Sequence, residues 1–218
     1  MKKDLTDITL IVDRSGSMHS IAEEARGSIK RLVEEQKKVP GECNFSLVLF
    51  DDRIERPFTA IPLAQVGDIP LEPRGMTSLL DAIGSTVKKT GLRFLAMPDD
   101  QRPERVVVVI VTDGQENNSK EYSVDQVKKM VQHQRAIYKW QFIFLAADES
   151  AITTGIGFGL NVGSSARYVP TPQGIAAAYQ VASKNITNYR GGAIASTDFT
   201  AEDRDQILKQ KLNKGTTS

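Results

Sequence analysis

One run of the sequence limits the fold more than any other. Residues 105–112, RVVVVIVT, contain an unbroken series of valine and isoleucine. β-Branched side chains favour strands, and the absence of polar alternation indicates that both faces of this strand are buried. Because a strand buried on both faces needs helices above and below it, the run predicts the central strand of a mainly parallel sheet.

The remainder of the chain alternates in the same way. Short apolar or β-branched runs predict strands at 8–12, 44–50, 54–60, 141–146 and 167–169. Apolar residues at three- and four-residue intervals predict helices at 20–38, 74–95, 123–138 and 173–189, and Thr200 with Asp203 predicts the cap of a last helix through Lys211. A tight turn at 51–53 makes the second and third strands an antiparallel hairpin. The expected fold class is α/β, a three-layer sandwich with one antiparallel edge strand.

Length and composition favour one soluble domain. We expect it over residues 1–190, followed at 191–218 by a polar extension with a short helix and a frayed end. The net charge of +1 provides no general attraction for nucleic acid or for an anionic membrane. A single cysteine, Cys43, excludes an internal disulfide, and the first apolar run is too short for a signal peptide or a membrane span. We therefore expect a cytoplasmic protein with Cys43 in its core.

Small oxygen-bearing side chains gather where the strands end. Asp13, Ser15 and Ser17 follow the first strand, Asp113 follows the central one, and Thr77 begins a helix. Parallel strands present their carboxyl ends at one edge of a sheet, so these side chains are expected to converge. Two carboxylates and three hydroxyls, without His or Cys, form a hard oxygen set that suits Mg²⁺ or Mn²⁺ and does not suit zinc or copper.

The charge of this set indicates its use. Asp13 and Asp113 together balance a divalent cation, and the other ligands are neutral hydroxyls. Such a cation stays electrophilic, and an open coordination position favours an anionic oxygen from outside, such as a carboxylate on a partner protein.

Three segments carry a family resemblance. DITLIVDRSGSM, RGMTSLLDAI and VVVVIVTDGQEN resemble the von Willebrand factor type A domain with its metal-ion-dependent adhesion site, over about residues 7–190. The resemblance implies a Rossmann-like fold in which Mg²⁺, with Mn²⁺ or Ca²⁺ as alternatives, bridges to an Asp or Glu of a partner. With its single cysteine and no expected signal peptide, the chain resembles the intracellular bacterial or phage members of the family more than the secreted adhesins. Some of those members work beside AAA+ ATPases or stress-response systems, and such a component is the candidate partner.

A metal-dependent hydrolase or phosphatase is the alternative function, because bound Mg²⁺ also polarises phosphoryl oxygens or activates water. An aspartyl-phosphate route would place a second carboxylate where Ser15 stands, and no general base is evident near the motif. A scaffold whose metal only stiffens loops is a third interpretation. We expect a protein-binding module and not an enzyme.

Several nearby residues have simpler interpretations. Arg14 is expected in solvent, and His19 and His133 on surface helices. Residues 51–52 are expected to form the hairpin turn and not a second metal site. The glycine-rich segment 155–163 does not follow a first strand into a helix, which disfavours a dinucleotide loop.

Overall fold

The computed structural model describes residues 1–209 and confirms the predicted fold class. Its strands are β1 (Lys2–Asp13), β2 (Cys43–Phe50), β3 (Ile54–Pro62), β4 (Pro103–Thr112), β5 (Gln141–Ala146) and β6 (Ser165–Arg167). Its helices are α1 (Ala22–Lys37), α2 (Leu79–Leu95), α3 (Val124–Tyr138), α4 (Ala151–Gly157), α5 (Pro172–Arg190) and α6 (Ala201–Leu208). The predicted end of the last helix at Lys211 and the predicted frayed terminus lie outside the described residues.

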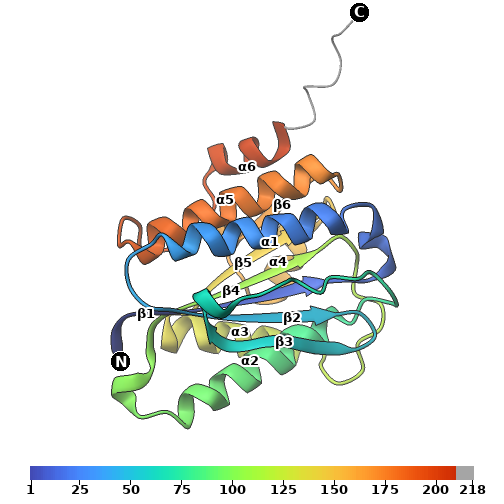
Figure 1. Ribbon diagram of the computed structural model, residues 1–218. Coiled ribbons are helices and arrows are strands. Elements are labelled where there is room, and N and C mark those ends of the chain that lie inside the picture. The colour runs from blue at the N-terminus through green and yellow to red at the C-terminus, as the bar shows by residue number, and fades with distance from the viewer. Residues whose placement is uncertain (210–218) are drawn as a thin grey trace, which may run out of the picture.

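The strands form one six-stranded sheet in the order β3-β2-β1-β4-β5-β6, in which only β3 is antiparallel. Helices α1, α5 and α6 cover one face, and α2 and α3 cover the other (Figure 1). Alternation along β1 sends Ile8, Leu10 and Val12 to the α1 side and Ile11 to the α2 side. The chain moves outward in both directions from the β1–β4 pair, and ligands of such sheets bind outside the strand ends at that point.

Most predicted elements agree closely with the structure. β5 has the predicted bounds, and Ser123 caps α3 in a capping box with Gln126. β1 begins earlier than predicted, at Lys2, because Lys2 pairs with Pro103 at the start of β4. The pairing register shifts between Lys2 and Thr6, where Asp4 has a φ of 59°. Polar residues at this exposed end of the strand hide it from any apolar pattern.

The glycine-rich segment 155–163 forms the end of α4 and the turn that follows. A Cβ at Gly155 would lie 2.2 Å from the Ser165 hydroxyl, so α4 approaches β6 closely only because this position lacks a side chain. Gly159 has a φ of 87°, in the left-handed region that glycine adopts without strain. Helix packing and chain reversal account for these glycines without a cofactor.

The segment after α5 packs against the main body. Thr200 and Asp203 form the predicted capping box of α6, and Asp203 also pairs with Lys184 of α5 at 2.6 Å. Phe199 and Ile207 are buried in the core under α1 and α5. The division of the chain at residue 190 stays a prediction. No helix within residues 1–209 combines the length and apolar character needed to cross a membrane.

Candidate metal centre

Asp13 ends β1 between β2 and β4, and its side chain is fully buried. Its Oδ1 accepts a hydrogen bond from the Ser15 backbone N–H at 2.7 Å, and its Oδ2 accepts one from the Thr112 hydroxyl at 2.6 Å. These bonds fix the carboxylate at the carboxyl edge of the sheet. Each of its oxygens keeps a further lone pair for another partner.

Hydrogen bonds link the next three site residues in a chain. The Ser15 and Ser17 hydroxyl oxygens lie 3.0 Å apart, and the Ser17 hydroxyl donates to Asp113 Oδ1 at 2.6 Å. Ser15 is buried, whereas Ser17 is exposed and Asp113 is half-buried. The loops after β1 and β4 therefore meet at one point, and that point is open to solvent.

Thr77 reaches the same place from the segment before α2. A Cβ added at Gly114 would lie 3.4 Å from the Thr77 hydroxyl oxygen and 3.6 Å from the Ser17 hydroxyl oxygen. The Thr77 and Ser17 hydroxyls therefore both lie next to Gly114, the residue after Asp113. All five residues singled out in the sequence gather around this edge of the sheet.

The donor set fits a hard divalent cation. Neighbouring ligands of an octahedral ion with metal–oxygen distances near 2.1 Å lie about 3 Å apart, and the Ser15 and Ser17 oxygens have that separation. Within residues 1–209, no group of three or more His, Cys, Asp and Glu side chains is arranged to hold a metal. A cation here would depend on the hydroxyls together with the two carboxylates.

The electrostatics of the site also favour a cation. Burial raises the pKa of Asp13 to about 6, against the hydrogen bonds from Thr112 and Ser15, and the nearby charge of Asp113 raises it further. Burial likewise raises the pKa of Asp113, against its hydrogen bond from Ser17. Two neighbouring, partly desolvated carboxylates repel each other, and a bound cation relieves that repulsion.

The expectation that the Arg14 side chain lies in solvent was wrong. Its side chain is only 3% exposed, its Nε lies 2.9 Å from Asp51 Oδ2, and its guanidinium also pairs with Glu55 at 2.8 Å. Arg74 binds the same two carboxylates from the loop before α2. This four-residue ion-pair network connects the loop after β1, the β2–β3 hairpin and the segment that carries Thr77.

Backbone hydrogen bonds reinforce that junction. The Arg74 N–H donates to the Arg14 carbonyl at 2.7 Å, and the Gly16 N–H donates to the Gly75 carbonyl at 3.2 Å. Gly75 has a φ of 69°, and a Cβ there would lie 2.5 Å from a carboxylate oxygen of Asp52. The loops that carry the hydroxyls are therefore held in place by contacts away from the oxygen cluster itself.

The loop after Asp113 caps α2, whose own N-cap residue Ser78 makes no side-chain capping bond. The Glu116 carboxylate accepts from the Leu80 N–H at 2.8 Å, and the Asn117 side-chain oxygen accepts from the Thr77 N–H at 3.0 Å. In return, Asp81 accepts three backbone N–H bonds from residues 120–122. Thr77 is thus positioned by the same loop that supplies Asp113.

Sequence reasoning missed two supporting residues. Thr112 holds Asp13, and the buried Tyr168 hydroxyl donates to the Thr112 carbonyl at 3.1 Å. Burial raises the pKa of Tyr168 well above its ordinary value, so its phenol stays protonated. The position of Thr112 directly before Asp113 was the available signal, whereas nothing local connects Tyr168 to this edge.

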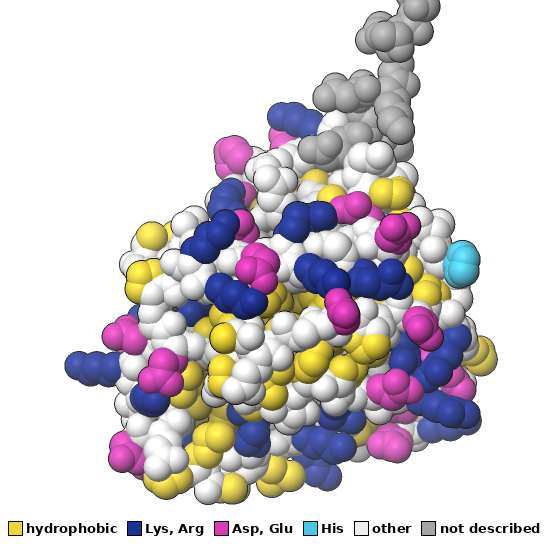
Figure 2. All heavy atoms as spheres, in the orientation of Figure 1, with side chains coloured by type: hydrophobic (Ala, Val, Ile, Leu, Met, Phe, Trp, Pro, Cys, Tyr) yellow, Lys and Arg dark blue, Asp and Glu magenta, His cyan; other side chains and the backbone are white. Residues whose placement is uncertain are grey.

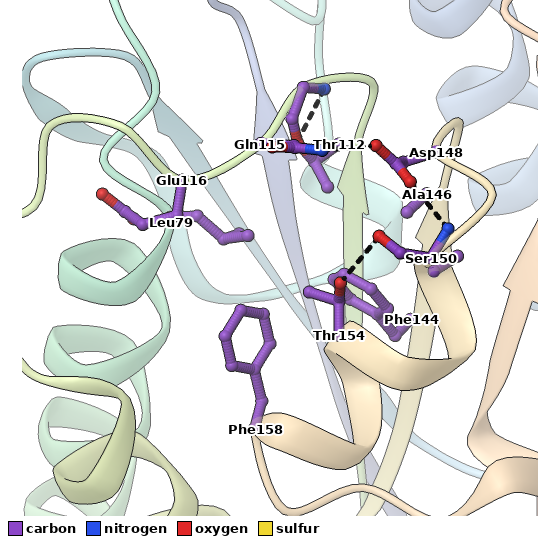
Figure 3. A pocket seen from close by; sticks show the side chains of 12 residues that line it. Leu79, Thr112, Gln115, Glu116, Phe144, Ala146, Asp148, Ser150, Thr154 and Phe158 are labelled. Atoms are coloured by element: carbon purple, nitrogen blue, oxygen red, sulfur yellow. Dashed lines mark hydrogen bonds between the residues drawn. The ribbon is translucent and has the colours of Figure 1, made fainter.

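A hollow of about 290 Å³ lies beside the oxygen cluster, between α2, α4 and the ends of β4 and β5 (Figure 3). Phe144 and Phe158 form its apolar floor, and Asp148 and Thr154 stand on the α4 side. Gly114, which lies next to the Thr77 and Ser17 hydroxyls, lines the hollow on the side of the oxygen cluster. A ligand that reaches the oxygen cluster would therefore lie over this surface.

Solved structures with the same architecture have low sequence identity. Proximal thread matrix protein 1 from the mussel byssus superposes with a TM-score of 0.60 at 16% identity, covering 84% of this chain and 46% of that chain. Another structure of that protein has a zinc-occupied MIDAS motif, the metal-ion-dependent adhesion site, and a TM-score of 0.58. The ArnB paralog VWA2 from Sulfolobus acidocaldarius gives 0.52 at 20% identity, covering 78% of this chain and 42% of that chain.

The chain thus spans less than half the length of these proteins. A comparison with curated proteins finds no significant match. A family model, the von Willebrand factor type A domain, matches residues 7–161, which is most of the chain and includes the five clustered residues. The protein belongs to the von Willebrand factor type A domain family.

Proposed function

We propose that this protein is a non-enzymatic binding module that recognises an acidic group of a partner protein through Mg²⁺. Asp13, Ser15, Ser17, Thr77 and Asp113 would hold the ion. The observation that carries the proposal is the hydrogen-bonded chain from Ser15 through Ser17 to Asp113 at a solvent-accessible point, with the Thr77 hydroxyl of a third segment close by. When bound, the cation supplies a positive centre that attracts an outside carboxylate.

The charge balance supports recognition of an acid. Two carboxylates neutralise the divalent ion, so the protein's oxygens do not compete strongly with an incoming anion. The apolar hollow next to the cluster would receive the side chain that neighbours the partner's acid, because an extended ligand at Gly114 lies over Phe144 and Phe158.

The arrangement of nearby acids argues against the hydrolase alternative. Glu116 accepts hydrogen bonds from the backbone of Leu80, Asn118 and Ser119, so its oxygens are occupied. Asp148 accepts from Gln115 at 2.7 Å and from the Ser150 backbone, which lowers the pKa of Asp148 to about 2. A general base at neutral pH needs a pKa near 7, and Asp148 does not meet that need.

The partner and the compartment are part of the same proposal. We infer a cytoplasmic module of the bacterial or phage type, whose single thiol, Cys43, is buried with a pKa raised by burial to about 12. An acidic segment of an AAA+ ATPase or of a stress-response component is the partner we propose.

The first test is direct metal binding. Paramagnetic Mn²⁺ should broaden the amide signals of residues 13–17, 77 and 113–114 selectively, and excess Mg²⁺ should reverse the effect. Asp13→Ala should weaken Mn²⁺ binding at least tenfold, because it removes one of two charges from the site. Asp99→Ala, which removes an 86% exposed carboxylate, is the matched control. Broadening spread evenly over surface acids would contradict the metal assignment.

The second test is partner recognition. Affinity capture from a native lysate, followed by mass spectrometry, should recover a protein in the presence of Mg²⁺. The same protein should be lost in EDTA and with Asp13→Ala, and the spectrum of the variant should still be that of a folded protein. Capture that persists in EDTA would refute metal-bridged recognition. Hydrolysis of a generic phosphate ester that disappears in Asp13→Asn would favour the enzyme instead.

A further inference from the structure

A second cavity opens to solvent away from the oxygen cluster, and the atoms that it exposes are mostly apolar. It has a volume of about 170 Å³ between α2 and the strands β1, β2 and β3. Thr9 of β1 and Thr86 of α2 line it together with Arg56, Lys89 and Arg93. Thr9 precedes Asp13 by four residues, which is about 13 Å along an extended strand. The cavity is therefore separate from the metal centre.

Positive charge in this cavity is only partly balanced. Arg93 pairs with the buried Asp7 at 2.9 Å. Arg56 is half-buried, donates to the Ser85 hydroxyl at 2.9 Å and has no carboxylate within 4.0 Å in residues 1–209. Lys89 has no carboxylate within that distance in the same residues either, and its side chain is exposed to solvent. Burial also lowers the pKa of Arg56. Figure 2 shows Lys and Arg side chains over the region of α2 and β3 as well as over α1, with Asp and Glu side chains between them.

Two hydroxyls add an independent sign of a ligand. Thr9 and Thr86 are 1% and 3% exposed, and neither hydroxyl oxygen has a hydrogen-bond partner in the part of the chain that the structure describes. A buried hydroxyl without a partner costs free energy. Thr9 also stands on the α2 side of β1, where Ile11 is part of the apolar core, so its polarity serves no packing purpose.

We propose that this cavity binds a phosphoryl group. The group carries nearly two negative charges and three acceptor oxygens, which match two unbalanced cations and two unpaired hydroxyl donors. A planar carboxylate has one charge and two oxygens, and would leave part of the set unsatisfied. A neighbouring hollow of about 490 Å³ shares Arg56 and Lys89 with the cavity and has room for the organic part of a phosphomonoester.

The test is a titration of the whole protein followed by amide NMR, with inorganic phosphate and glycerol 3-phosphate as separate probes. EDTA removes metal-bound phosphate from consideration, and chloride keeps the ionic strength constant. Saturable shifts should centre on residues 9, 46, 56–59 and 86–93. Tighter binding of the ester identifies a phosphomonoester as the ligand, and equal or weaker binding identifies free phosphate. Absence of saturable shifts with both probes overturns the proposal.

Variants decide whether the cavity itself is the site. Arg56→Gln with Lys89→Gln should weaken binding at least tenfold, and Thr86→Val should weaken it about fivefold to tenfold by removing one neutral donor. Thr86→Val should fold normally, because its hydroxyl is unpaired in the protein alone. Lys128→Gln with Lys129→Gln, two exposed charges on α3, should change binding less than twofold. An equal loss in this control, or no loss in Thr86→Val, would show general charge attraction and overturn the proposal.

Discussion

The buried carboxylate of Asp13 depends on a small number of donors. Its Oδ2 has the Thr112 hydroxyl at 2.6 Å, and removing that donor leaves a desolvated charge with one bond fewer. We expect Thr112→Val to lower the free energy of unfolding by about 1–3 kcal/mol in the absence of metal. Urea denaturation at pH 7.5 in EDTA measures this change.

Thr112→Ser is the matched control, because it keeps the hydroxyl and loses only a methyl group. It should retain most of the stability that Thr112→Val loses. If the serine variant is as unstable as the valine variant, packing of the threonine methyl accounts for the effect and the hydrogen bond to Asp13 does not.

The sequence revealed the oxygen-bearing residues but not what holds them. Asp13, Ser15 and Ser17 form a compact motif after an apolar run, and such a pattern is visible locally. Arg14 was misplaced because its partner comes from another strand. Parallel pairing sets Asp13 opposite Phe50, which brings the next residue, Asp51, beside Arg14. Register between strands is a tertiary property that no local pattern contains.

Whole elements were predictable wherever an apolar pattern marked them. β4 and β5 are continuous apolar runs, and the structure has them close to their predicted bounds. α4 was missed because glycine at 155 and 157 is unfavourable in a helix interior. Contact with β6 overrides that preference at Gly155, where a side chain would collide with Ser165.

The two glycines of α4 give a matched pair of variants. Gly155→Ala forces a Cβ to within 2.2 Å of the Ser165 hydroxyl, so it should lower the free energy of unfolding by about 1–3 kcal/mol. Gly157→Ala meets nothing within 4 Å and should raise it slightly, by about 0.5 kcal/mol or less, because alanine favours a helix and this position is the last residue of α4. Urea denaturation of both proteins checks the opposite signs, and destabilisation by Gly157→Ala would contradict this account.

The ion-pair network between the loops predicts a pH dependence. Hydrogen bonds from Arg14, with Arg74 and against partial desolvation, lower the pKa of Glu55 from 4.5 to about 2. Because the folded-state pKa is lowered, this stabilisation is present above pH 4.5 and is lost as the pH falls toward 2. Glu55→Gln should therefore be less stable than the natural protein at pH 6, and the difference should shrink by pH 3.

Urea denaturation at pH 6, 5, 4 and 3 measures that difference. Glu149→Gln is the control, because its carboxylate is 85% exposed and, within residues 1–209, pairs only with Arg167 at 3.2 Å. Its difference from the natural protein should stay small at each pH. A difference for Glu55→Gln that is constant from pH 6 to pH 3 would show that the network does not depend on the Glu55 charge.

At the scale of the whole domain, residues 1–209 form two apolar cores, one on each face of a single sheet. The family model ends at residue 161, yet β6, α5 and α6 complete the core on the α1 side. Gln36 of α1 donates to the Ser183 carbonyl of α5, and Arg190 donates back to the Gln36 carbonyl. These buried polar contacts connect α1 to α5. Residues after 161 are therefore needed to complete the core on the α1 side of the sheet.

Whether α6 shares in the cooperative unfolding of the molecule is open to a sharp test. Ile207 is fully buried in the same core as the apolar residues of α5. If α6 unfolds with the whole domain, Ile207→Ala should lower the free energy of unfolding by about 2–5 kcal/mol. Trp140, the single tryptophan, is buried in the opposite core, so its fluorescence reports unfolding on the far side of the sheet. Ile207→Ala should then lower the urea midpoint of Trp140 fluorescence, whereas Leu208→Ala, at a 36% exposed neighbour, should hardly move it. An unchanged Trp140 midpoint in Ile207→Ala would mean that α6 detaches before the domain unfolds, as expected for an extension that begins at residue 191.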